Sequence, residues 1–171
     1  MSNEQIDLIG GNPTIFMMVG LPYSGKSTFL KSQKVLRELP VASTDEYLER
    51  LAKQTGKSYG EIINTEFKNA KKHMNAEIAG WLKSKQSFVW DQTNLTKVSR
   101  RRVIDLAKAN GFKVYAIEFA PFPNEKALMK RVEQRKDKVI PMKVLQVMKA
   151  RFEAPSFKEG YDKFVYINTW I

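Results

Sequence analysis

Short apolar runs alternate along this chain with segments whose apolar residues recur at helical spacing. Short apolar runs are typical of buried strands, and apolar positions three or four apart are typical of amphipathic helices. The predicted strands span residues 14–19, 40–43, 87–90, 113–119 and 164–167. The predicted helices span residues 26–37, 46–54, 59–85, 97–109, 124–136 and 142–152. Strands that alternate with helices predict an α/β fold, with a mainly parallel central sheet between two layers of helices. Ligands of such a sheet are expected at the carboxyl ends of its strands.

The first predicted strand runs into the stretch "GLPYSGKST", residues 20–28, which matches G-x-x-x-x-G-K-[ST] between a strand and a helix. Its glycines let the backbone wrap a polyphosphate, and the N–H groups at the helix start attract the anion. Lys26 would reach the β- and γ-phosphates, Ser27 would offer its hydroxyl to Mg²⁺, and Thr28 is expected only in the first helical turn. The predicted nucleotide contacts are Gly20, Leu21, Pro22, Tyr23, Ser24, Gly25, Lys26, Ser27 and Thr28. We therefore predict a three-layer sandwich of the P-loop NTPase type, with ATP and Mg²⁺ as cofactors.

Composition narrows the setting of this site. With 171 residues and no internal linker, residues 1–171 are expected to form one domain. The absence of cysteine excludes disulfides and thiolate metal sites, and no apolar run is long enough to cross a membrane, so we expect a cytoplasmic protein without a membrane partner. A net charge of +11 favours a polyanionic partner such as nucleic acid, although solvated basic helix faces are the alternative.

Two acidic residues follow predicted strands and would stand beside the phosphate loop. Asp45, in "ASTDEYLERL", could accept the proton of an attacking hydroxyl group. The alternative is a capping role, because Ser43 and Glu46 have the spacing of a capping box. Asp91 ends the strand in "FVWDQTNL", a position at which P-loop proteins commonly bind Mg²⁺, although Asp is also a frequent turn residue.

A late helix carries a pair of arginines in "LMKRVEQRK". Arg131 and Arg135 are four residues apart and would share one helical face. Residues 124–140 are therefore predicted to form a lid whose guanidinium groups offset charge on the transferring phosphate. The alternative is that both arginines are solvated on an ordinary basic helix.

Together these segments resemble the kinase domains of polynucleotide 5′-hydroxyl kinases, over about residues 14–168. The matching segments are "GLPYSGKSTFLK", "STDEY", "DQTNLT" followed by "RRR", "LMKRVEQRKDKVIPMKVLQVMK" and "FEAPSFKEGYDKFVYI". The resemblance implies that Asp45 is the general base, that Asp91 organises the site, and that Arg131 and Arg135 contact the donor phosphates. Leu48 departs from the phage branch of the family, in which an arginine at this position contacts an acceptor phosphate.

The function expected from this resemblance is Mg²⁺-dependent transfer of the ATP γ-phosphate to a hydroxyl group of nucleic acid, most simply a 5′ end. Arg100, Arg101 and Arg102 are the predicted nucleic-acid contacts, with DNA favoured over RNA. Three alternatives stay open: a kinase of hydroxymethyl bases in phage DNA, in which case the protein would work in the host cytoplasm, a kinase of a small metabolite, and a non-catalytic nucleic-acid-binding protein that uses ATP as a switch.

Overall fold

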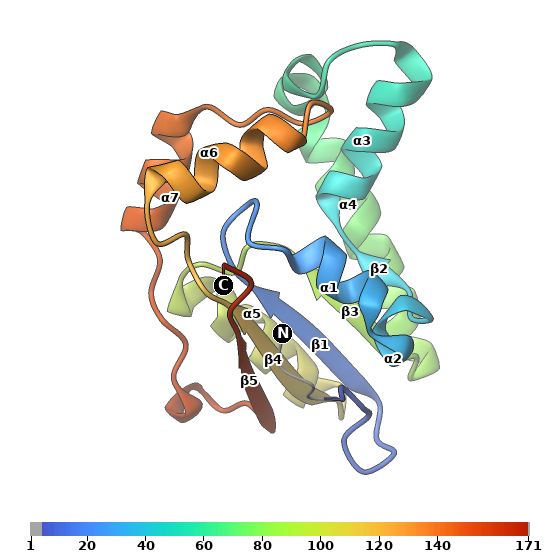
Figure 1. Cartoon of the computed structure of the whole chain (residues 1–171). Coiled ribbons are helices and arrows are strands. Elements are labelled where there is room, and N and C mark those ends of the chain that lie inside the picture. Colours follow the sequence, from blue (N-terminus) through green and yellow to red (C-terminus); the bar gives the residue numbers. More distant parts are fainter. Residues whose placement is uncertain (1–4, 171) are drawn as a thin grey trace.

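The fold is built on a parallel sheet, which the computed structural model describes within residues 5–170. Its strands are β1 (Thr14–Val19), β2 (Val41–Ala42), β3 (Phe88–Asp91), β4 (Lys113–Phe119) and β5 (Lys163–Ile167). They lie in the order β2-β3-β1-β4-β5, and every described strand pair is parallel (Figure 1). The strand that precedes the phosphate loop therefore occupies the centre of the sheet.

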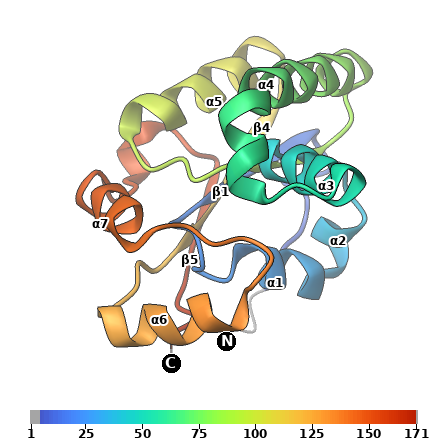
Figure 2. The ribbon, with the colours of Figure 1, turned by 90° about the horizontal axis from the view of Figure 1, so that it is seen from above.

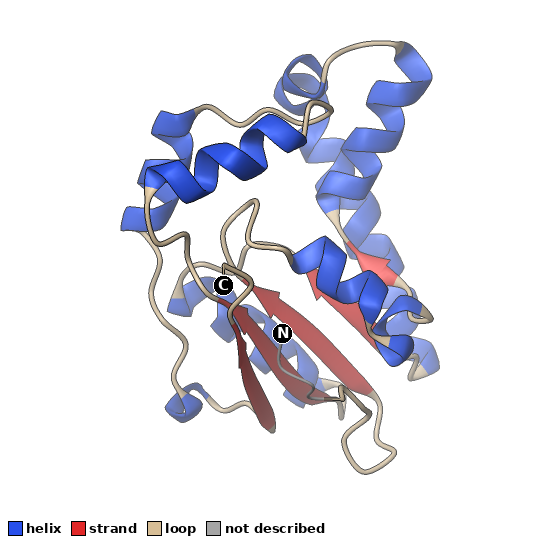
Figure 3. Ribbon diagram, in the orientation of Figure 1, coloured by secondary structure: helices blue, strands red, loops and turns tan. Residues whose placement is uncertain are grey.

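The helices follow the predicted segments closely. They are α1 (Lys26–Ser32), α2 (Lys34–Arg37), α3 (Thr44–Thr55), α4 (Tyr59–Ser84), α5 (Lys97–Ala109), α6 (Glu125–Gln134) and α7 (Met142–Ala150), with a short 3₁₀ turn, η1 (Phe157–Glu159) (Figure 3). The helix predicted over 26–37 is divided, because the backbone of Gln33 is extended. No helix within residues 5–170 has the length and apolar character needed to span a bilayer.

Side chains of β1 point alternately to the two faces of the sheet, and both faces are buried. Ile15 and Met17 belong to the apolar cluster that includes residues of α4 and α5, whereas Phe16 and Met18 belong to the cluster that includes residues of α1 and α2. All four side chains are fully buried, as a strand covered on both sides requires. The predicted three-layer sandwich is thereby confirmed.

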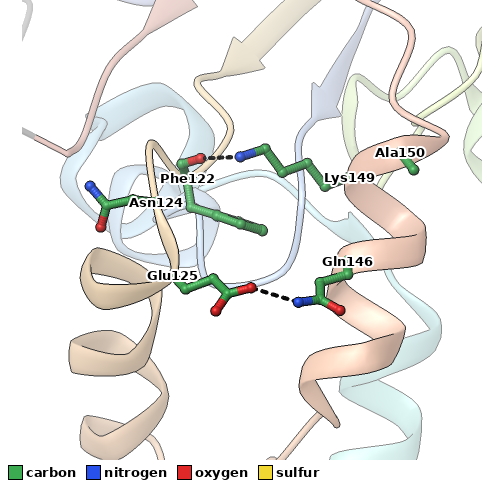
Figure 4. Close-up of a pocket in the computed structure, with 6 residues that line it drawn as sticks. All are labelled: Phe122, Asn124, Glu125, Gln146, Lys149 and Ala150. Atoms are coloured by element: carbon green, nitrogen blue, oxygen red, sulfur yellow. Dashed lines mark hydrogen bonds between the residues drawn. The ribbon is translucent and has the colours of Figure 1, made fainter.

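A separate apolar cluster lies above the carboxyl edge of the sheet and supports α6 and α7 (Figure 1). Its buried members are Leu21, Phe122, Leu128 and Leu145. Polar contacts also join the two helices: Gln146 Nε2 donates to Glu125 Oε1 (2.6 Å), and Lys149 Nζ donates to the Phe122 carbonyl (2.8 Å) (Figure 4). The region predicted as a lid therefore rests on its own core beside the phosphate loop.

A further cluster joins α3 to α4 and accounts for the leucine noted in the sequence. Leu48 is fully buried among residues that include Tyr59 and Ile62 of α4. The Arg50 guanidinium instead lies over the Tyr47 ring, 5.8 Å from its centroid. Position 48 is thus a packing position in this protein.

Candidate active site

The phosphate loop needs glycine at both of its motif positions. Gly25 precedes α1 with φ of 93°, a left-handed conformation that side chains rarely adopt, and a Cβ atom there would lie 3.1 Å from Thr169 Cγ2. A Cβ atom on Gly20 would lie 2.9 Å from Ser24 Oγ and 3.0 Å from Phe119 Cβ. The loop is therefore closely packed from both sides, and its curvature depends on the two glycines.

Two features of the loop fit a polyphosphate. The Ser24 hydroxyl is buried and has no hydrogen-bond partner among the described residues. The start of α1 has no side-chain cap, so the N–H groups of its first turn receive no side-chain acceptor there. Phosphate oxygens would satisfy both kinds of donor, in agreement with the predicted nucleotide contacts.

Lys26 lies where its charge interacts with the carboxylates of the site. Its Nζ donates to the carbonyls of Gly20 (2.8 Å) and Leu21 (2.9 Å). Burial lowers the pKa of Lys26 to about 8, although the negative charges of Asp91 and Asp45 act in the opposite direction. The three residues predicted from separate motifs are therefore electrostatically coupled at one edge of the sheet.

Asp91 stands at the carboxyl end of β3, opposite Met18 of the central strand. Burial raises the pKa of this carboxyl group, and the positive charge of Lys26 partly offsets the effect. Ser27 and Asp91 are both oxygen ligands of the kind that Mg²⁺ prefers. The described residues contain no cluster of three acidic or histidine ligands. A Mg²⁺ ion held by Ser27 and Asp91 would take its other ligands from nucleotide and water.

Asp45 directs its carboxylate into the site, while the capping role belongs to Ser43. The Ser43 hydroxyl accepts from the Glu46 N–H (3.3 Å) at the start of α3. Asp45 Oδ1 accepts from the Tyr59 hydroxyl (2.6 Å), and Oδ2 accepts from Lys138 Nζ. Burial alone would raise the pKa of Asp45, but the charge and hydrogen bond of Lys138, together with the bond from Tyr59, bring it below its usual value.

Lys138 is a site residue that the sequence did not reveal. It lies in the loop after α6, its side chain is 7% exposed, and its ammonium group lies 4.7 Å from the centroid of the Tyr59 ring. The Tyr23 hydroxyl donates to the Lys138 carbonyl (2.8 Å) and accepts from the Ile140 N–H (3.2 Å). The lid is thereby joined to α3 through Lys138 and to the phosphate loop through Tyr23.

The two lid arginines point to different partners. Arg131 Nη1 donates to the Tyr23 carbonyl (2.8 Å) and to Thr169 Oγ1 (3.0 Å), and its guanidinium lies 3.6 Å from the Trp170 ring centroid. Arg135 Nη2 instead contacts Glu49 Oε1 of α3 (3.0 Å). They do not share one helical face, because α6 ends at Gln134 and Arg135 has a non-helical backbone.

The predicted nucleic-acid contact of Arg100 is wrong. Its side chain is 0% exposed, its Nε pairs with Glu159 Oε2 (2.8 Å), and its Nη1 donates to the Asn94 carbonyl (3.0 Å). A nucleic-acid phosphate cannot reach a guanidinium in this position. Arg101 and Arg102 are exposed, and Arg101 makes a surface pair with Asp105 (3.7 Å).

Solved structures with a similar fold share only a small part of their sequence with this chain. A protein from Chloroflexus aurantiacus superposes with a TM-score of 0.70 at 20% identity, over 93% of this chain and 86% of the other. A gluconokinase from Sinorhizobium meliloti gives 0.57 at 18%, over 91% and 82%. The AvrRxo1-ORF1:-ORF2 complex, solved with ATP, gives 0.65 at 24%, over 83% of this chain and 48% of that one. At these identities the likeness establishes the fold.

A family model adds direct sequence evidence. The model described as "AAA domain" matches residues 15–155, which include the phosphate loop, both carboxylates and the lid. That span covers most of the chain. It corresponds to a P-loop domain, in agreement with the order of the strands and with the turn at Gly25 and Lys26. The chain belongs to this P-loop family, AAA_33.

Proposed function

We propose that this protein is an ATP-dependent kinase that phosphorylates a hydroxyl group of a small metabolite. One observation carries the proposal: Asp45 and the phosphate-loop residue Lys26 each influence the pKa of the other, and the lid reaches the same carboxylate through Lys138. A proton acceptor, a phosphate-binding cation and a lid in one place are what direct phosphoryl transfer requires.

The residues divide the reaction between them. Lys26 and the loop hold the phosphates of ATP, and ionised Asp45 takes the proton of the acceptor hydroxyl as its oxygen attacks the γ-phosphorus. The bond to the β-phosphate oxygen then breaks, and ADP leaves. Each carboxylate oxygen has two lone pairs, so Oδ2 of Asp45 can accept the acceptor hydroxyl while it keeps Lys138. Mg²⁺, held by Ser27 and Asp91, would neutralise phosphate charge when bound.

The kind of acceptor is supported by the structural neighbours and by the packing of α3. The solved structures similar to this chain include a gluconokinase, which points to a small hydroxylated acceptor. Leu48 is buried, and it occupies the α3 position that holds a phosphate-binding arginine in the phage polynucleotide kinases. A buried leucine cannot bind an acceptor phosphate. We therefore place the small metabolite ahead of the polynucleotide acceptor expected from the sequence.

A polynucleotide 5′-hydroxyl remains the second candidate. The net charge of +11 and the exposed side chains of Arg101 and Arg102 favour it. A hydroxymethyl base in duplex DNA would use the same chemistry on an extruded nucleotide. A switch protein would bind ATP without transfer to any acceptor.

A panel of acceptors tests the proposal. The protein is incubated with γ-labelled ATP and Mg²⁺, and with sugars, sugar acids, nucleosides, a 5′-hydroxyl oligonucleotide or DNA containing hydroxymethyl bases. We expect label to enter at least one small acceptor, and we expect Lys26→Met to lower that transfer by about 10²–10³-fold. Transfer to the oligonucleotide or DNA alone would contradict the small-metabolite proposal. ATP binding without transfer to any acceptor would instead favour a switch protein.

A further inference from the structure

A cavity of about 660 Å³ lies beside the candidate active site, between α4, α5, α7 and the end of β3. Figure 2 shows α4 and α5 side by side over one face of the sheet, with α7 beside the start of α5. Cavities of roughly 300–1,000 Å³ are the usual size for small-molecule sites. The volume therefore suits one compact ligand, and the donor phosphates already have a site at the P-loop.

The cavity is surrounded by positive charge without a counter-charge. Lys71 projects from α4, Arg102 from α5, and Lys143 and Arg151 from α7 and its end. None of the described residues that line the cavity is acidic. Within residues 5–170 none of these four side chains forms an ion pair or a hydrogen bond, although ion pairs are present elsewhere, such as Arg101 with Asp105. Four converging, unpaired cations favour an anionic ligand and especially a phosphate group.

Part of the remaining wall of the cavity is apolar, beside uncharged polar residues that include Gln92 and Ser99. Trp90 of β3, Met74 of α4, and Val144, Val147 and Met148 of α7 contribute to it. Val144 and Val147 are 42% and 52% exposed, so they present apolar surface that the described residues do not cover. A ligand with a compact carbon skeleton or a ring, carrying a phosphate, would match both walls.

The cavity borders residues that neighbour the two carboxylates of the active site. Gln92 lines it and directly follows Asp91. Gln92 Nε2 donates to Thr44 Oγ1 (3.2 Å), and Thr44 is the neighbour of Asp45 at the start of α3. The wall formed by Gln92 is therefore the side of the cavity that adjoins the active site.

We infer that this cavity is the acceptor site and that the acceptor is a small hydroxyl compound that already carries a phosphate group. The inference rests on the kinase function proposed above. It assigns Lys71, Arg102, Lys143 and Arg151 the task of selecting the acceptor by its charge, and Trp90 the task of packing against its carbon skeleton.

The test uses acceptors that differ by one phosphate: glycerol and glycerol 3-phosphate, ribose and ribose 5-phosphate, adenosine and adenosine 3′-monophosphate. We expect kcat/KM to be at least about tenfold higher for the phosphorylated member of one pair, the size of one lost charge-assisted contact. The double variant Lys143→Gln/Arg151→Gln should raise KM for that member about tenfold and leave KM for ATP unchanged. The matched control is Lys83→Gln/Lys126→Gln, which removes the same charge from exposed positions outside the cavity.

Calorimetric titration of the same phosphorylated compounds into wild type and both double variants separates this inference from the kinase proposal. Binding that only the cavity variant weakens, without transfer, would support the site and remove the kinase function. Equal kcat/KM within every pair, equal effects of the two double variants, or transfer confined to an oligonucleotide would overturn the inference.

Discussion

The phosphate loop and the lid meet at Tyr23, but they are built in different ways. The loop joins consecutive elements, β1 and α1, and close packing against Phe119 and Thr169 determines its shape. The lid loop is held by contacts between segments far apart in the chain, among them Lys138 with Asp45 and Tyr23 with the Lys138 carbonyl. The first region is thus one contiguous segment whose shape is fixed by packing, and the second depends on a small number of polar contacts.

This difference has a functional meaning. A donor site that is formed by packing keeps its geometry throughout the reaction, as electrostatic stabilisation of the transferring phosphate requires. The lid loop after α6, held by a few hydrogen bonds and ion pairs, can open and close at small cost in free energy. Substitutions in the loop should therefore remove chemistry, whereas substitutions in the lid should change its order and its dependence on pH.

The largest effect is expected for Lys26→Met, in the phosphate loop. Methionine keeps much of the side-chain volume but removes the charge that faces the phosphates, so we expect transfer to fall by about 10²–10³-fold. Steady-state kinetics with the acceptor identified by the panel would measure the loss. A rate within twofold of wild type would show that the loop does not position the γ-phosphate.

The lid loop is tested by Lys138→Met. Without the Lys138 ammonium, two of the causes that lower the pKa of Asp45 are lost, and this pKa should rise. Because the base must be ionised, the acidic limb of the pH profile of kcat/KM should move to higher pH. Below the new pKa the rate should fall about tenfold for each pH unit.

The control for Lys138→Met is Lys136→Met, at an exposed position of the same loop. Its pH profile should match that of wild type. An acidic limb that is the same in both variants would break the proposed link between the lid and the base.

A smaller effect is expected at Tyr23, where the phosphate loop contacts the lid. Tyr23→Phe removes the hydroxyl that bonds the Lys138 carbonyl and the Ile140 N–H, at a cost of about 0.5–1.5 kcal/mol in lid order. Hydrogen exchange of the Ile140 amide should then be about 2- to 10-fold faster. Tyr166→Phe, an exposed tyrosine on β5, should leave this amide unchanged, and equal exchange in all three proteins would separate the lid from the loop.

The smallest expected signal is a fraction of a proton. With a pKa of about 8, roughly half of the Lys26 side chains are neutral at pH 8. The phosphates of ATP favour the charged form, so binding should take up about half a proton at pH 8 and much less through Lys26 at pH 6.5. Calorimetry in buffers of different ionisation enthalpy would measure the uptake, and Lys26→Arg, which stays charged, should abolish it.

Much of the donor site could be predicted from the sequence, for physical reasons. Residues 20–28 form a contiguous motif, and Asp45 and Asp91 follow strands whose carboxyl ends meet at one edge of a parallel sheet. The continuous apolar run of β1 likewise predicted a buried strand. Local pattern and sheet topology were sufficient for these residues.

Lys138 and Arg100 show where the sequence was insufficient. Lys138 is one of several lysines in a charged run, and its role arises only when the lid loop folds against α3. Arg100 lies on the same helical face as Val103, Ile104 and Ala107, a spacing that could have indicated burial. Its partner Glu159 is 59 residues away, so no local pattern shows the pair.

The measurement that tests the central claim most directly is single-turnover transfer by Asp45→Asn, together with its affinity for ATP. Asparagine keeps the shape of the side chain and can accept from Tyr59, but it cannot take the acceptor proton. The account predicts that transfer falls by about 10²–10⁴-fold while ATP binds as in wild type, with Glu133→Gln on the exposed face of α6 as the unaffected control. Wild-type transfer by Asp45→Asn would contradict it.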